Sequence, residues 1–392
     1  MRLHIDRCAL VYLLAVSNYE SSSFKIKNVP RHLAKEEVKM KTLLRLLLKS
    51  QHQQNRYEPA KIEKGMTLVE LLIGTIMAFL IITPMLGFVV DMLNTDRREQ
   101  IKASTEQDIQ AAVDFIAQDL SQAIYIYDNN TALNGTPNTT PTGIPAIQNF
   151  LPPTNANQTT ILVFWKRQQL KNSLPLTATA QPSSCTPNTS SGSGACNDTY
   201  VLALVAYYQV SGSTGIWCQP LGTDCPSRIV RYQIQDGLRD PSLTNADPLQ
   251  NYFTGVSLEQ ERSSAFNPVF DLSQPTQNVT LGPNWGDPKV LVNYIDHSPG
   301  PTLPVDACKT ALGTPTIQNG SATDEIPEGR LRIVGPTNSF YACVDTQRNL
   351  ARVTIRGNSL RRFQNDANYD AQKSAFFPTA SVQVQGLGAR GR

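Results

Sequence analysis

The chain has 392 residues and a formal net charge of +3, a length that suits about one to three domains. Residues 1–65 hold 13 of the 35 Lys and Arg but 6 of the 32 Asp and Glu, which leaves 22 bases and 26 acids for the remainder. A nucleic-acid-binding protein needs a clustered basic face. The acidic remainder therefore argues against a nucleic-acid partner.

Residues 1–65 are predicted to be a basic flank on the cytoplasmic side, because basic flanks of a membrane span stay in the cytoplasm. This flank also contains Met40. A start at this methionine would shorten the flank to residues 40–65, and we interpret it as the alternative true start. An apolar stretch at 8–16 follows a basic segment, but no A-x-A cleavage site comes after it, which disfavours a secretory signal.

Residues 71–90 are twenty uncharged, mostly apolar residues. As a helix they would be ~30 Å long, the thickness of the hydrocarbon core of a bilayer. The sequence therefore predicts a single span in a lipid bilayer. Pro84 lies inside it, and a proline is expected to kink the helix or to melt it locally.

One carboxylate, Glu70, directly precedes this uncharged run. A carboxylate at the centre of a membrane costs about 3 kcal/mol and normally has a partner. At the edge of the membrane the cost is lower, and an acidic residue at a helix start is favoured by the helix dipole. Glu70 therefore has two interpretations, a paired charge or a local helix-start residue.

The residues from Gly65 to Leu72, Gly-Met-Thr-Leu-Val-Glu-Leu-Leu, resemble the processing signal of type IV prepilins and type II secretion pseudopilins. The resemblance implies that a prepilin peptidase cuts between Gly65 and Met66 and methylates the new amino terminus of Met66. It also implies that Glu70 neutralises the amino terminus of a neighbouring subunit in a filament. The helix proline of that family comes a few residues later than Pro84, so the kink position departs from the pattern.

The segment after the span is predicted to continue the helix with one apolar stripe. Apolar residues recur at spacings of 4, 3, 4 and 3 at Ile109, Val113, Ile116, Leu120 and Ala123. No glycine or proline lies between Phe88 and Asn134. The predicted helix runs from Met66 to near Tyr127, ~90 Å, with a transmembrane half at 66–90 and an amphipathic half at 91–128. Its end resembles the J-type minor pseudopilins.

Residues 129–385 are predicted to be a β-rich periplasmic head, followed by a disordered tail at 386–392. Strand-like runs occur at 159–165, 199–210, 228–235, 289–295, 330–334, 339–344 and 350–355. The predicted fold class is α+β: a long N-terminal membrane-spanning helix whose distal half packs on an antiparallel β-sheet with long disulfide-tied loops.

An even set of cysteines follows the span, which is typical of disulfides in an oxidising compartment. Six cysteines allow 15 connectivities, and the sequence alone does not choose among them. Pairing between sequence neighbours is the simplest, and six reduced buried thiols are the alternative. The candidates are Cys185, Cys196, Cys218, Cys225, Cys308 and Cys343.

The head has no hydrolase, zinc-protease or nucleotide-binding motif, and His297 is its only histidine. We therefore predict no enzymatic activity and no cofactor. Calcium is the alternative, because loop carboxylates bind this ion and some pseudopilin heads do so, although no EF-hand spacing is present. The carboxylates that gather loosely are Asp224, Asp236 and Asp240, and again Asp366 and Asp370.

The resemblance implies a minor pilin or pseudopilin of the inner membrane, with a cytoplasmic amino terminus and a periplasmic head, that joins a periplasmic or surface filament. The expected partners are prepilin peptidase, other pilins or pseudopilins and the inner-membrane assembly platform. The large head favours the tip or initiation complex, and also resembles hormogonium polysaccharide secretion pseudopilins. The alternatives are an adhesive or DNA-uptake minor pilin of a surface type IV pilus, and a non-polymerising single-pass anchored binding protein.

Overall fold

The computed structural model describes residues 67–130, 142–152, 157–177, 180–187, 189, 191–192, 194–212, 216–221, 225–319, 322–365 and 367–390. Outside these residues lie the predicted leader with Met40, the predicted cleavage residues Gly65 and Met66, and the carboxylates Asp224 and Asp366. The chain divides into two compact units, residues 1–83 and 84–392, and each is described by itself.

Helix α3, Leu68–Ser121, has Pro84 inside it and continues through that residue. Of the two effects expected of this proline, local melting is absent and the kink stays a prediction. The helix ends at Ser121 and not near Tyr127 as predicted. Strand β1, Ala123–Ile126, follows at once and pairs with β2. The reason is that the segment Ala-Ile-Tyr-Ile is rich in β-branched and aromatic residues, which fit a pleated, half-buried surface better than a helix.

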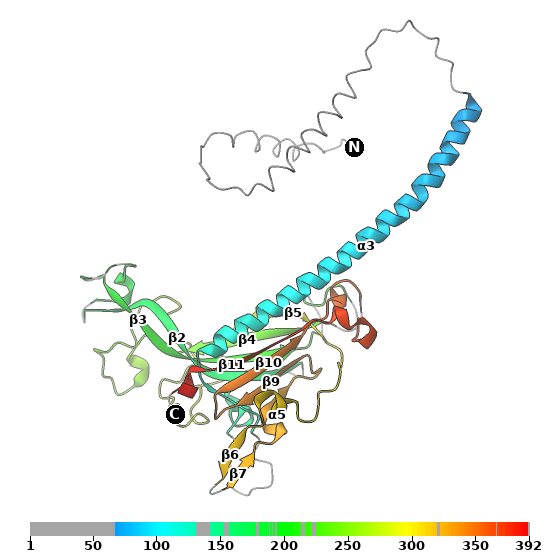
Figure 1. Ribbon diagram of the computed structural model, residues 1–392. Helices are drawn as coiled ribbons and strands as arrows, with labels where there is room; N and C mark the ends of the chain where they lie inside the picture. The colour runs from blue at the N-terminus through cyan, green and yellow to red at the C-terminus, as the bar shows by residue number, and fades with distance from the viewer. Residues whose placement is uncertain are drawn as a thin grey trace, which may run out of the picture. The chain divides into compact units, whose positions relative to one another are not determined.

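The head contains two larger antiparallel sheets and one hairpin (Figure 1). The five-stranded sheet has the order β1-β2-β3-β4-β5, with β2 at Gln158–Pro175, β3 at Cys196–Val210, β4 at Ser227–Gln235 and β5 at Lys289–Ile295. The four-stranded sheet has the order β11-β10-β9-β8, with β8 at Arg332–Val334, β9 at Phe340–Asp345, β10 at Leu350–Arg356 and β11 at Thr379–Gln385. The hairpin joins β6, Thr316–Asn319, to β7, Ala322–Glu325.

Short helices fill the connections between the strands. The α-helices are α4, Ile144–Ile147, α5, Ala307–Leu312, and α6, Glu328–Leu331. The 3-10 helices are η1, Gln148–Phe150, η2, Pro182–Ser184, η3, Pro248–Gln250, η4, Leu360–Arg362, η5, Ala371–Phe376, and η6, Leu387–Arg390.

The main hydrophobic core joins the second half of α3 to both larger sheets. The predicted stripe on α3 is buried, with Ile109, Val113, Ile116 and Leu120 at most 1% exposed. These residues share one cluster with side chains of the two sheets, including Phe164, Tyr207, Phe340 and Val353. Burial of each Ile or Leu side chain contributes about 1.5–3 kcal/mol to the stability. This stripe therefore holds the head against the helix. The α+β class and the antiparallel sheets after a long apolar helix are therefore as predicted.

Residues 386–390, which belong to the predicted disordered tail, have defined structure. The Gly386 N–H donates a hydrogen bond to the Asn349 carbonyl at 2.9 Å, and η6 follows directly. A Cβ on Gly388 would lie 2.0 Å from the Ile124 carbonyl oxygen, so only glycine permits this close approach. Residues 386–388 therefore lie against β1 and the turn before β10.

Candidate functional site: the apolar helix and its seat on the head

The first turn of α3 begins at a capping threonine. The Thr67 Oγ1 atom accepts a hydrogen bond from the Glu70 N–H at 3.3 Å, which satisfies one of the amide groups that a helix start leaves without a partner. Glu70 lies in this first turn and is exposed. The arrangement Thr-x-x-Glu is that of a capping box. The observed hydrogen bond uses the main chain of Glu70, so both interpretations of its carboxylate stay predictions.

The first half of α3 exposes its apolar side chains on all sides. Large hydrophobic residues from Leu68 to Leu93 are 45–85% exposed, and α3 is the one helix among the described residues that is long and apolar enough to cross a membrane. Soluble proteins rarely expose apolar patches of this size. This part of the chain therefore needs lipid or other helices around it.

The second half of α3 carries a buried acid, Asp119, where it meets the five-stranded sheet. The Asp119 carboxylate accepts hydrogen bonds from Lys166 Nζ at 2.8 Å, Arg231 Nε at 2.7 Å and the Tyr207 hydroxyl at 2.7 Å. The side chains of Asp119, Lys166 and Arg231 are 8%, 5% and 10% exposed. Burial by itself would raise the pKa of Asp119, but the attraction of Arg231 and Lys166 outweighs it and holds this pKa below its usual value.

A groove of about 750 Å³ opens beside this charge cluster. The groove is lined by Asp119, Lys166 and Arg231. Lys166 and Arg231 already form ion pairs with Asp119, and Arg231 also donates a hydrogen bond to Gln233. A catalytic acid or base has to exchange a proton with its substrate. A carboxylate held by three donors is poorly suited to that task, so these contacts point to a structural role.

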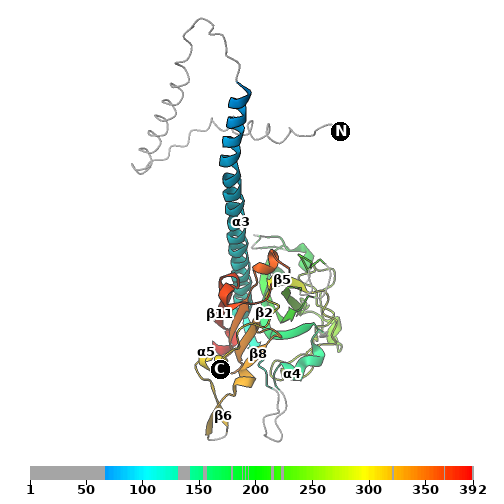
Figure 2. The same ribbon diagram turned by 90° about the vertical axis from the view of Figure 1, so that its right-hand side faces the viewer.

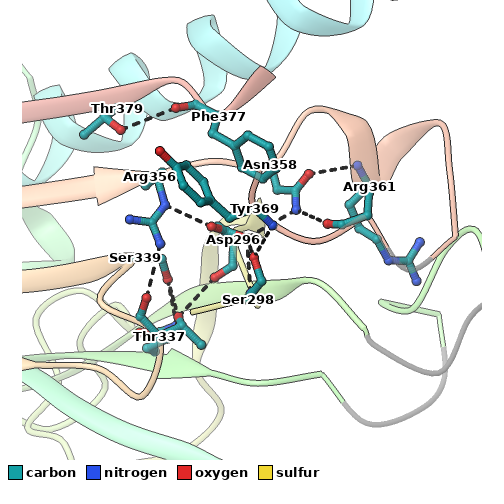
Figure 3. Close-up of polar contacts among 12 residues, drawn as sticks. Asp296, Ser298, Thr337, Ser339, Arg356, Asn358, Arg361, Tyr369, Phe377 and Thr379 are labelled. Carbon is teal, nitrogen blue, oxygen red and sulfur yellow. Dashed lines mark hydrogen bonds and ion pairs between the residues drawn. The ribbon is translucent and has the colours of Figure 1, made fainter. Parts of the chain in front are cut away.

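A second buried polar centre lies between the end of β5 and the end of β10 (Figure 3). The Asp296 carboxylate, which is fully buried, accepts from Arg356 Nε at 2.9 Å, from Asn358 Nδ2 at 3.2 Å and from the Ser298 hydroxyl at 2.7 Å. Figure 3 shows these side chains pointing toward one another. The centre fixes the start of the segment that leads from β10 to β11, since the Asn358 side chain also donates to the Ala367 carbonyl.

The segment between β10 and β11 also contacts α3 through Arg362. Its guanidinium forms an ion pair with Asp108 and donates to the Ser104 hydroxyl at 3.1 Å. The next residue, Phe363, lies under the guanidinium groups of Arg97 and Arg98, which are 5.4 and 5.8 Å from its ring centroid. The head is therefore fastened to α3 by charged contacts at two levels, Asp108 and Asp119.

The six candidate cysteines form three disulfides, each between sequence neighbours. The Cys185–Cys196 bond closes the connection between β2 and β3, and the Cys218–Cys225 bond closes the connection between β3 and β4. The third disulfide, between Cys308 and Cys343, joins α5 to β9. The simplest pairing inferred from the sequence is thus the pairing in the structure.

The loop carboxylates that suggested calcium are used in local hydrogen bonds. Asp236 pairs with Arg239 and accepts from the Tyr252 hydroxyl, and Asp370 accepts from the Gln372 N–H. Among the residues that the structure describes, no group of three or more His, Cys, Asp or Glu side chains is arranged to hold a metal ion. The same carboxylates therefore have structural partners.

The partners of Asp119 were not predicted from the sequence. One signal was present, because Asp119 follows Ile116 by three residues and so lies on the apolar stripe of the predicted helix. An acid on a buried stripe requires a cationic partner. The sequence did not reveal which cations would come from β2 and β4.

No protein-family model, curated protein or solved structure matches the chain. The pilin resemblance therefore rests on the residues around Gly65 and Glu70 and on the pattern of the helix.

Proposed function

We propose that the chain is a non-enzymatic minor pilin or pseudopilin, cut by a prepilin peptidase between Gly65 and Met66 and N-methylated at Met66. The observation that carries the proposal is the start of α3. The cap at Thr67 and the first-turn residue Glu70 come directly after the proposed cleavage bond. Processing would therefore leave a helix with a single residue, and a new ammonium group, in front of its cap.

The new ammonium group gives the charge on Glu70 a function in assembly. In the proposed filament, the Glu70 carboxylate of one subunit lies near the N-methylated amino terminus of the next. Because the apolar half of α3 needs lipid or helices around it, this pair would form largely outside water, where the attraction between opposite charges is stronger. Removal of either charge would leave the other without a partner, which is unfavourable.

The head supports a place at the tip or in the initiation complex. Stems in a filament pack closely, so the heads that they carry must also be closely spaced. The segment between β4 and β5 adds a long irregular insertion at 236–288 to this head. A subunit at the tip has no head above it, and so has room for such an insertion. The proposed location is the inner membrane first and a periplasmic or surface filament afterwards, with other pilins or pseudopilins and the assembly platform as partners.

Mass spectrometry of the protein purified from its native host tests the proposal. We expect an N-terminal peptide that begins at N-methylated Met66. The variant Gly65→Ala should keep its leader, since the peptidase site of this family admits only a glycine-sized side chain before the cut. The variant Glu63→Gln is the control and should be processed normally. An intact, unmethylated leader on the wild-type chain would refute the proposal.

A non-polymerising single-pass anchored protein is the second candidate. The Thr-x-x-Glu spacing at the helix start favours it, because a capping box would give the Glu70 carboxylate a purpose within one chain. This candidate keeps residues 1–65. The same mass spectrum therefore separates the two candidates.

A further inference from the structure

The two larger sheets have four edge strands, and three of them are protected against pairing with another chain. At β1, the Asn349 side chain donates to the Ala123 carbonyl and the Thr346 hydroxyl donates to the Ile126 carbonyl, both at 2.8 Å. The edge of β1 is therefore covered by the turn between β9 and β10.

The edges at β5 and β8 are protected in other ways. Strand β5 begins with Lys289 and has two irregularities in its register with β4. The Asn358 N–H also donates to the Tyr294 carbonyl of β5 at 2.8 Å. Strand β8 has three residues, and Asn129 donates to the Arg332 carbonyl at 3.2 Å. Charges, bulges, short length and a covering segment are the usual means by which proteins prevent edge pairing.

Strand β11 has no charge, no bulge and no segment of the described chain hydrogen-bonded to its outer edge. All seven of its residues pair with β10 in a regular register without a bulge. Its sequence, Thr-Ala-Ser-Val-Gln-Val-Gln, has no charge and no proline. Within the described residues, no hydrogen bond joins the outer edge of β11 to another segment. Since alternate residues of an edge strand direct their N–H and C=O groups outward, this edge is a template for a further strand.

The hydrophobic core is also incomplete at this edge. The side chains of Ala380, Val382 and Val384 pack against the core cluster but stay half-buried, and the residues that alternate with them are exposed. We propose that the outer edge of β11 receives an extended segment of another protein, which becomes the fifth strand of this sheet. The main-chain hydrogen bonds of such an addition give affinity, and alternate side chains give specificity.

The pattern of β11 defines the chemistry of the partner segment. The segment has about seven residues, because it must match the length of β11. It is uncharged, with small or β-branched apolar side chains facing the row of Ala380, Val382 and Val384. Its alternate residues are neutral and polar, like Ser381 and Gln383. Same-face pairs of this kind stabilise a sheet by about 0.2–1 kcal/mol each.

A second copy of this chain fits the edge poorly. Strand β11 lies beside the second half of α3 in both views (Figures 1 and 2). Antiparallel pairing of two β11 strands requires a two-fold axis perpendicular to the sheet. The α3 helices of the two chains would then run in opposite directions. Two chains that are both anchored by α3 in one membrane do not allow this. Parallel pairing would turn the second sheet over and set its polar row beside the apolar row. This step rests on the membrane anchor, and not on cleavage or polymerisation.

Site-specific photo-crosslinking tests the inference in the full chain, expressed in its native host. The cross-linking residue replaces Thr379, Ser381 or Gln383 in turn, and Gln318 on the β6–β7 hairpin is the control position. We expect adducts with one partner protein. When the cross-linking residue moves by two positions along β11, the cross-linked residue in the partner should also move by two positions, which is the signature of strand pairing. Adducts without this register, adducts with a second copy of the chain, or a yield no higher than at Gln318 would overturn the proposal.

Added charge on the edge provides an independent variant. Ser381→Lys combined with Gln383→Lys should reduce the yield of the Thr379 adduct at least tenfold, because lysines on an edge strand oppose the addition of another strand. Thr316→Lys combined with Gln318→Lys is the matched control, since both of these residues are exposed on one strand at the same spacing. The single variant Gln383→Lys repeats the test if the double variant unfolds. An unchanged yield in a variant with a wild-type melting temperature would overturn the proposal.

Discussion

Removal of the Asp119 carboxylate is expected to destabilise the head strongly. In Asp119→Ala, the cations of Lys166 and Arg231 would stay in a site where their side chains are only 5% and 10% exposed. The variant loses bonds of 2.8 and 2.7 Å to these cations and leaves the Tyr207 hydroxyl without its acceptor. Breaking a buried pair by removing one partner costs about 3–5 kcal/mol. At roughly 2 °C per kcal/mol for a domain of this size, the melting temperature should fall by about 6–10 °C.

The assay is thermal unfolding of the full chain in detergent, followed by tryptophan fluorescence, because Trp165 and Trp285 are buried in the head. Asp114→Ala is the control on the same helix, since Asp114 is exposed and its side-chain partner is Gln110. Surface changes of this kind stay within about 0.5 kcal/mol. A loss below about 1 kcal/mol in Asp119→Ala would refute the reasoning.

The depressed pKa of Asp119 adds a prediction of pH dependence. A carboxyl whose pKa is lower in the folded state contributes stability that is complete above its unfolded-state pKa, about 3.9, and that is lost as the pH falls through the folded-state value. The difference in stability between the wild type and Asp119→Ala should therefore be constant near neutral pH and shrink below about pH 4. A difference that stays constant down to acid unfolding would contradict this assignment.

Two further predictions concern the helix start and the disulfides. Glu70→Gln keeps a side chain able to cap the helix but removes the charge. Processed protein should therefore accumulate while filament incorporation, measured by co-purification of partner subunits, falls. Normal incorporation would support a capping role alone. Loss of the Cys308–Cys343 disulfide should destabilise the chain by about 1.4 kcal/mol more than loss of the Cys218–Cys225 disulfide, because the two bonds close loops of 35 and 7 residues. Chemical denaturation of the two paired Cys→Ser variants measures this difference, and equal losses would argue against it.

The features that were predictable from the sequence depend on patterns within one segment. The long helix and its buried stripe follow from hydrophobic spacing, and seven strands follow from runs of β-branched and aromatic residues. The disulfide pairs join sequence neighbours, which is the simplest pairing. Each of these inferences required no knowledge of which segments meet in space.

The features that were missed depend on contacts between distant segments. Strand β11 has no large apolar side chain, only Ala380, Val382 and Val384 among polar residues, and it pairs with β10 along its full length. The end of α3 at Ser121 reflects the pairing of β1 with β2, although no glycine or proline marks that point. The Asp296 centre likewise brings together residues that are separated by as many as 62 positions in sequence. Local propensity does not contain this information.

The charged contacts have a mechanical consequence that the apolar stripe alone could not provide. Apolar contact is not directional, so Ile109, Val113 and similar side chains fix the position of the helix less specifically than hydrogen bonds do. The ion pair of Arg362 with Asp108 and the cluster at Asp119 hold α3 at two levels, about three helical turns or ~16 Å apart. A shift of one residue moves the helix ~1.5 Å along its axis, enough to break hydrogen bonds of 2.7–2.8 Å to a buried carboxylate. In the proposed filament, a push on the stem is therefore transmitted to the head without slippage.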